Sequence, residues 1–127
     1  MIYLDTHIVV WLYGGLTEKF TALAGSLLND HDLYISPIVR LELQYLYEIE
    51  RISVPADTII LDLGDRLGLK ICEKDFHRVV GYGLGLSWTR DPFDRLIVAQ
   101  AAISENILLT KDIKILENYA QAQWDLS

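Results

Sequence analysis

The sequence predicts an α/β fold, with a parallel β-sheet covered by helices on both faces. Short apolar segments typical of strands alternate with helical segments along all 127 residues, which is the pattern of β–α–β units. The composition, 51% hydrophobic and 23% charged residues, is that of a globular chain. The length is that of one domain with a full core, so we expect a single domain over residues 1–127.

Five segments have the pattern of strands. They are residues 1–4, 32–36, 69–72, 107–110 and a last strand around 122–126. Ligands of parallel sheets bind at the carboxyl ends of the strands. The residues that follow each strand are therefore the first place to look for a site.

The segments between the strands have helical periodicity or helix-start signals. The expected helices cover residues 7–13, 17–30, 37–51, 55–68, 75–87, a segment from 92 onward, and 113–119. Gly14 and Gly15 close the first helix, and Pro37 suits the first turn of the third. The helix over 75–87 is weaker, because each of its glycines costs about 1 kcal/mol in a helix interior.

Composition and charge exclude several classes of protein. The longest apolar runs are far too short to span a bilayer, and the N-terminus has neither the basic segment nor the cleavage site of a secretory signal. Cys72 is the single cysteine and cannot form an internal disulfide, so we expect a cytoplasmic protein. The net charge of −7 argues against a broad nucleic-acid-binding surface. It does not exclude a nuclease whose substrate meets a metal ion in an acidic pocket.

Two acidic residues lie where strands end. Asp5 follows the first strand directly, and Asp112 lies just beyond the strand over 107–110. If both strands lie near the switch point of the sheet, both carboxylates reach the same crevice. Each residue could also serve only as the N-cap of the helix that follows it.

Glu42 interrupts an apolar face of the predicted helix over 37–51. The other residues of this face, at helical spacing, are Ile38, Tyr45, Leu46 and Ile49. An ionised carboxylate on a core-facing stripe is costly unless a cation or hydrogen bonds compensate for it. Glu42 could therefore bind a metal ion, or it could pair with an arginine such as Arg40 or Arg95.

The stretch RDPFDR contains two aspartates with different expected roles. Asp91 directly precedes Pro92 and is well placed as an N-cap. Asp94 shares a helix face with the apolar residues Ile97 and Val98, so it is expected to point towards the core or the site. It could also be only a first-turn acid favoured by the helix dipole.

Four carboxylates in one pocket repel each other, and a divalent cation relieves that repulsion. The three histidines have no metal-ligand spacing and Cys72 has no thiol partner, so oxygen ligands point to Mg²⁺ or Mn²⁺. The natural chemistry of such a cluster is metal-assisted phosphodiester hydrolysis.

The chain resembles PIN-domain ribonucleases, specifically VapC-type toxins of bacterial toxin–antitoxin pairs. The resemblance runs through the whole chain in order and is carried by MIYLDTHIVVWL, ISPIVRLEL, RDPFDRLIVAQA and ILLTKD. It implies a three-layer α/β/α sandwich with a mainly parallel sheet and Mg²⁺- or Mn²⁺-dependent cleavage of RNA. The catalytic and metal-binding residues that it implies are Asp5, Glu42, Asp94 and Asp112.

The resemblance also implies supporting residues and partners. Thr6 and Thr110 match hydroxyl positions that orient ligands or water, whereas Asp91 matches a motif position without being a usual metal ligand. A homodimer and a cognate antitoxin are expected, with the antitoxin tail supplying a blocking side chain. The stretches HIVVWLY and LQYLYEIERI could present its contact surface, or could be ordinary core.

A few basic residues near the acids could hold a backbone phosphate of the substrate. They are Arg90, Arg95 and Lys111. Arg95 could equally pair with Asp91 or Glu42.

Two other classes of function fit part of the pattern. A receiver-type signalling domain has a similar length and Mg²⁺-binding acids, but it needs an acidic pair after the first strand, where this chain has Asp5 and Thr6. In a non-catalytic Mg²⁺-binding interaction domain, the acids would serve folding alone. No feature of the sequence distinguishes RNA from DNA as the substrate.

Overall fold

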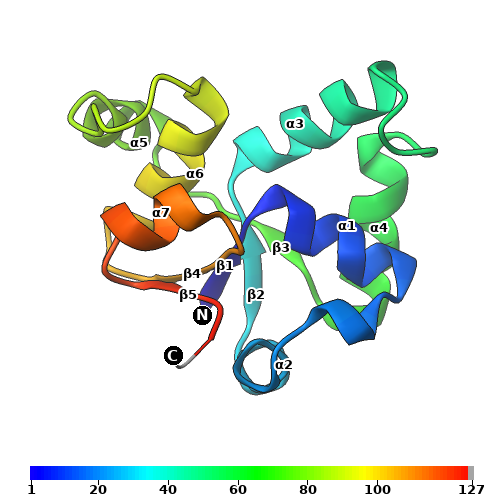
Figure 1. The fold of residues 1–127 in the computed structure, drawn as a ribbon. Helices are drawn as coiled ribbons and strands as arrows, with labels where there is room; N and C mark the ends of the chain where they lie inside the picture. The colour runs from blue at the N-terminus through cyan, green and yellow to red at the C-terminus, as the bar shows by residue number, and fades with distance from the viewer. Residues whose placement is uncertain (126–127) are drawn as a thin grey trace.

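Five parallel strands form the central sheet of the structure, a computed structural model that describes residues 1–125 (Figure 1). The strands are β1 (Ile2–Leu4), β2 (Leu33–Ile35), β3 (Lys70–Ile71), β4 (Ile107–Leu109) and β5 (Ala122–Gln123). Their order is β3-β2-β1-β4-β5, and every pairing is parallel. β1 therefore lies at the centre, with Ile2 paired to Leu33 of β2 and to Ile107 of β4.

Helices cover both faces of the sheet and make the three-layer α/β/α sandwich. They are α1 (Thr6–Gly14), the 3₁₀ turn η1 (Thr17–Lys19), α2 (Ala22–Asp30), α3 (Pro37–Glu48), α4 (Ala56–Leu67), α5 (Phe76–Gly83), α6 (Pro92–Ala102) and α7 (Ile113–Asn118). Helices α1, α3 and α4 pack against one another on the right of Figure 1, while α5 packs on α6 on the left. Within residues 1–125, no helix is long and apolar enough to cross a membrane.

The central strand is buried because both of its faces are covered. Ile2, Tyr3 and Leu4 are each at most 1% exposed and join the main core cluster with Leu108 and Leu109 of β4. The first residue after β1 thus enters the crevice from a rigid, fully packed element.

Several helices begin with a side-chain cap close behind a strand. Asp5, Ser36 and Asp112 follow β1, β2 and β4 and cap α1, α3 and α7 respectively. Polar side chains therefore gather at the carboxyl edge of the sheet as a direct result of how its β–α turns are built.

Some predicted boundaries are wrong. The helix expected over 17–30 breaks at Phe20, which is extended, so η1 and α2 are separate. The helix expected over 37–51 ends at Glu48, and the one over 75–87 ends at Gly83. The last strand is confined to Ala122–Gln123, and residue 126 of the predicted strand lies outside the described residues.

The predicted core-facing side of α3 is also wrong. Val39 and Leu43 are fully buried, whereas Tyr45 is 46% and Ile49 is 44% exposed. The helix packs on the core through a stripe offset by one residue from the predicted one. Glu42 is half-buried at the border of this stripe instead of at its centre.

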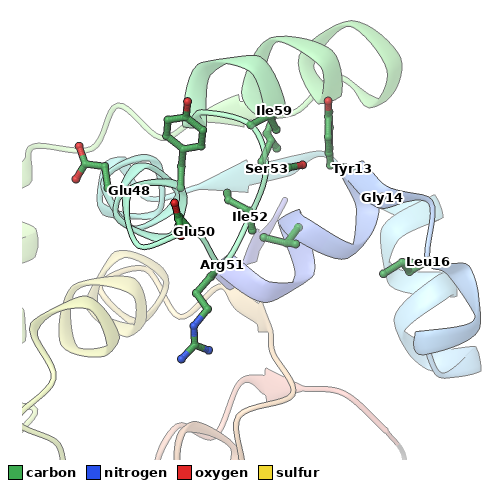
Figure 2. A pocket seen from close by; sticks show the side chains of 12 residues that line it. Tyr13, Gly14, Leu16, Glu48, Glu50, Arg51, Ile52, Ser53 and Ile59 are labelled. Atoms are coloured by element: carbon green, nitrogen blue, oxygen red, sulfur yellow. The ribbon is translucent and has the colours of Figure 1, made fainter.

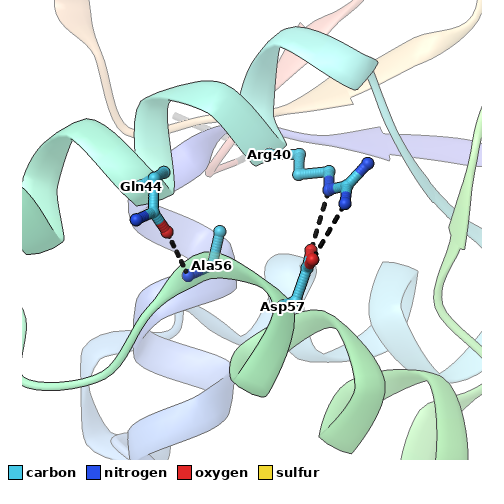
Figure 3. A network of polar contacts seen from close by, with 4 residues as sticks. All are labelled: Arg40, Gln44, Ala56 and Asp57. Atoms are coloured by element: carbon cyan, nitrogen blue, oxygen red, sulfur yellow. Dashed lines mark hydrogen bonds and ion pairs between the residues drawn. The ribbon is translucent and has the colours of Figure 1, made fainter.

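A polar network joins α3 to α4 (Figure 3). The Arg40 Nε and Nη2 atoms donate to the two carboxylate oxygens of Asp57 at 2.7 and 2.8 Å. The Gln44 Oε1 atom accepts from the backbone N–H of Ala56 at 3.1 Å. Because Pro55 at the N-cap supplies no side-chain acceptor, Gln44 caps α4 from another helix.

We expect Gln44→Ala to lower the free energy of unfolding by about 1 kcal/mol, the usual value of a lost cap. Arg40→Ala should cost less than about 1 kcal/mol, because the Arg40–Asp57 pair is solvent-exposed. Urea unfolding of both variants beside the wild type measures the difference. An unchanged stability of Gln44→Ala would contradict its capping role, and a loss well above about 1 kcal/mol for Arg40→Ala would contradict the small value expected of an exposed ion pair.

Candidate functional site

All four predicted acids line one pocket of about 280 Å³ at the carboxyl edge of the sheet. Its lining residues are Asp5, His7, Trp11, Glu42, Asp94, Lys111 and Asp112. They come from the ends of β1 and β4 and from the first half of α1, α3 and α6. Residues distant in the chain therefore meet in one acidic crevice.

Asp5 is buried at the bottom of this arrangement and is 7% exposed. Its Oδ1 accepts from the Thr6 N–H at 2.8 Å and its Oδ2 accepts from the Thr110 hydroxyl at 2.6 Å. Burial raises the pKa of Asp5, and these two hydrogen bonds lower it in part. Asp5 is thus both the cap of α1 and a wall of the pocket.

Glu42 accepts a hydrogen bond from the Thr6 hydroxyl. Burial raises the pKa of Glu42, and the charges of Asp5 and Asp91 raise it further. Neither arginine considered as its partner pairs with it, because Arg40 binds Asp57 and Arg95 donates to backbone carbonyls.

Asp94 is half-buried and, like Asp5 and Glu42, has a raised pKa. Burial, followed by the charges of the neighbouring carboxylates, raises the pKa of Asp94 to about 7. Asp91 has the structural role expected of it, because its Oδ1 accepts from the N–H of Phe93 at 2.8 Å and from that of Asp94 at 3.3 Å.

Asp112 is exposed and caps α7, with its Oδ1 accepting from the Ile115 N–H at 3.0 Å. Its own N–H donates to the Thr110 hydroxyl oxygen at 3.0 Å. The Thr110 hydroxyl therefore hydrogen-bonds to both Asp5 and Asp112. In the same way, Thr6 links Asp5, through its N–H, to Glu42, through its hydroxyl. The two predicted supporting hydroxyls hold neighbouring acids in place.

Of the three basic residues predicted to bind substrate, one lines the pocket and two contact backbone carbonyls elsewhere. Lys111 lines the pocket. The Arg90 guanidinium donates to the Ser87 carbonyl, and that of Arg95 donates to the carbonyls of Gly83 and Leu84. Neither arginine is among the lining residues, and their contact with a substrate stays a prediction.

His7 and Trp11 were missed by the sequence analysis. They lie four residues apart in α1 and their rings contact each other, with centroids 6.4 Å apart. The His7 ring lowers the pKa of both Asp5 and Glu42. Their i, i+4 spacing directly after a strand-end aspartate is the signal that could have identified them.

The donor set of the pocket fits a hard divalent cation. Carboxylate oxygens are the ligands of Mg²⁺ and Mn²⁺. Burial first, and then the charges of neighbouring carboxylates, raise the pKa values of Glu42 and Asp94, and a bound cation would offset both effects. Within residues 1–125, no three acidic, histidine or cysteine side chains are close enough to form a ready-made ligand cluster.

We expect Asp94→Asn to be more stable than the wild type in metal-free solution at pH 8, by about 2–5 °C in thermal midpoint. The folded protein holds a proton on Asp94 up to about pH 7, whereas the unfolded chain loses it near pH 4. The stability of the wild type therefore falls as the pH rises from about 4 to about 7. Thermal unfolding in EDTA across this range should show the advantage of the variant shrinking at lower pH, and a less stable variant at pH 8 would contradict the repulsion.

Comparison with known proteins supplies the family. A structure titled as the crystal structure of VapBC2 from Rickettsia felis bound to a DNA fragment from their promoter matches with a TM-score of 0.70 and 24% identity, over 98% of this chain and 100% of that one. A search among curated proteins finds no match. The family model of the PIN domain matches residues 2–121. A match over nearly the whole length shows that this chain belongs to the PIN domain family.

Proposed function

We propose that this protein is a metal-dependent endoribonuclease and the toxin of a type II toxin–antitoxin pair. The observation that carries the proposal is the meeting of Asp5, Glu42, Asp94 and Asp112 in one pocket of a PIN domain. Family membership favours a nuclease over a receiver domain, and the similarity to a VapBC structure supports the toxin assignment.

In the proposed mechanism, Asp5, Glu42 and Asp94 hold Mg²⁺ or Mn²⁺ with help from Asp112. When bound, the ion supplies positive charge to the phosphate and activates water for attack on phosphorus. The Thr110 hydroxyl fixes the orientation of the Asp5 carboxylate, and the Thr6 hydroxyl fixes that of Glu42. These bonds keep both carboxylates aimed into the pocket before substrate binds.

A second pocket supports the proposed antitoxin partner (Figure 2). It has a volume of about 880 Å³ and is lined mainly by the end of α1, the end of α3 and the segment before α4. Both stretches predicted to contact an antitoxin contribute, HIVVWLY through Val10 and Tyr13 and LQYLYEIERI through Tyr47 and Ile52. The same two helices also border the acidic pocket, since Asp5 caps α1 and Glu42 lies on α3. One bound segment lying along both helices could therefore reach the catalytic acids.

The proposal also includes a homodimer in the cytoplasm. An exposed apolar stripe, formed by Leu41 and Tyr45 of α3 and by Ile49 at its C-cap, supports a contact between copies.

We expect the wild type to cut total bacterial RNA with Mg²⁺ or Mn²⁺ and not with EDTA. Asp5→Asn and Asp94→Asn should abolish cutting while leaving the fold intact, because each amide keeps the shape of the side chain without its charge. Asp91→Asn is the matched control and should keep most activity, since asparagine caps a helix about as well as aspartate.

Two outcomes would count against parts of this proposal. Loss of activity in Asp91→Asn would make Asp91 a site residue. Metal binding by the wild type in a calorimetric titration, without any cutting by the antitoxin-free protein, would favour a non-catalytic metal-binding domain.

A further inference from the structure

Trp11 lies at the centre of an aromatic cluster beside the acidic pocket. Its ring centroid is 6.3 Å from that of Phe20 and 5.9 Å from that of Trp124, and these two rings are 6.0 Å apart. The Thr21 hydroxyl donates to the Trp124 carbonyl, which ties the chain after β5 to the start of α2. The Trp11 ring is therefore held by three separate segments of the chain.

Two lysines from different segments reach this ring. The Nζ atom of Lys19, in η1, lies 5.3 Å from a ring centroid of Trp11, and that of Lys111, after β4, lies 5.6 Å from one. Both distances are those of cation–π contacts, and both lysines are exposed. Two ammonium groups are thus brought to one ring, an arrangement that attracts an anion.

The position of this pair relative to the acids is the second observation. Trp11 and Lys111 line the same pocket as the four carboxylates. An RNA strand whose scissile phosphate lies at those carboxylates must pass other phosphates over the pocket wall. Lys111 lies on this wall, where such a phosphate would meet positive charge. Lys19 is not a lining residue, but it reaches the same Trp11 ring and adds a second positive charge there.

Several other cations of the chain are engaged elsewhere. Arg40 pairs with Asp57, and Arg66 pairs with Asp62. The Lys74 ammonium donates to the Gln100 carbonyl and to the side-chain oxygen of Asn106. The chain has a net charge of −7, so its overall charge repels a polyanion. The two lysines at Trp11 would attract the phosphates of such a ligand locally.

We propose that Lys19 and Lys111, held over Trp11, form a subsite for the backbone phosphates that flank the scissile bond of single-stranded RNA. Trp11 is the positioning residue, because its ring contacts and orients both lysines. This inference rests on the proposed ribonuclease function, and it specifies which residues bind the RNA strand beside the catalytic acids.

The test measures binding separately from cutting. A fluorescent 12-nucleotide single-stranded RNA pool of random sequence is titrated with Asp94→Asn protein in Mg²⁺, at several salt concentrations, by anisotropy. In this background, Lys19→Ala and Lys111→Ala should each weaken binding several-fold and reduce the slope of log affinity against log salt by about 0.7, the value for one lost phosphate contact to a single strand. Lys70→Ala, which removes an exposed lysine from the edge strand β3, is the matched control and should change neither quantity.

The role of Trp11 is tested with a second set of variants in the same assay. Trp11→Leu should weaken binding, and Trp11→Phe, which keeps an aromatic face, should restore most of it. Trp124→Leu removes a neighbouring ring of the same cluster but keeps the Trp11 ring that the lysines contact, so it should lower the thermal midpoint with little change in affinity. Equal loss of affinity in Trp124→Leu and Trp11→Leu would overturn the positioning role.

The outcomes separate this inference from the proposed function. Metal-dependent cutting of RNA by the wild type, together with lysine variants that bind like Lys70→Ala, would overturn the subsite alone. Absence of cutting by the folded, antitoxin-free wild type would instead overturn the proposed function on which the subsite rests.

Discussion

Burial of the Asp5 carboxylate is the constraint on which the rest of the site depends. A buried carboxylate needs hydrogen-bond donors, and the Thr6 N–H and the Thr110 hydroxyl supply one to each of its oxygens. Thr110 is within reach because β4 lies beside β1 in the sheet. The same turn that caps α1 also directs the Thr6 hydroxyl to Glu42. The order of the strands thus fixes the position of the acids.

The acids of the pocket have opposite effects on the stability of the folded state. Asp5 and Asp112 begin helices, and each accepts backbone N–H groups that would otherwise lack partners. Burial nevertheless raises the pKa of Asp5, Glu42 and Asp94, so their ionised forms weaken the folded state. Such a loss of stability is typical of functional sites, where natural proteins keep buried charged groups that lower the stability of the fold.

Features that depend on local sequence could be predicted, whereas features that depend on contacts between distant segments could not. Strand ends identified Asp5 and Asp112, because a β–α turn places its residues by local geometry. Asp94 was identified by the helix face that it shares with Ile97 and Val98. Glu42 was found on partly wrong grounds, since α3 buries the stripe of Val39 and Leu43 and not the face that contains Glu42. The strand order and the contacts of Lys19 with Trp11 were out of reach, because they join segments whose meeting depends on the whole fold.

The hydrogen bond between Asp5 and Thr110 joins residues 105 positions apart in the chain. Contacts of such separation form late, since the loop between them must close first. A chain still emerging from the ribosome therefore has its first acid in place long before the residue that orients it. Until β4 is added beside β1, the buried carboxylate lacks one of its donors, and the acidic pocket is incomplete. A nuclease built on this plan would stay inactive while the residues between Asp5 and Thr110 are synthesised, and would gain its active geometry only when β4 and Thr110 have joined the sheet.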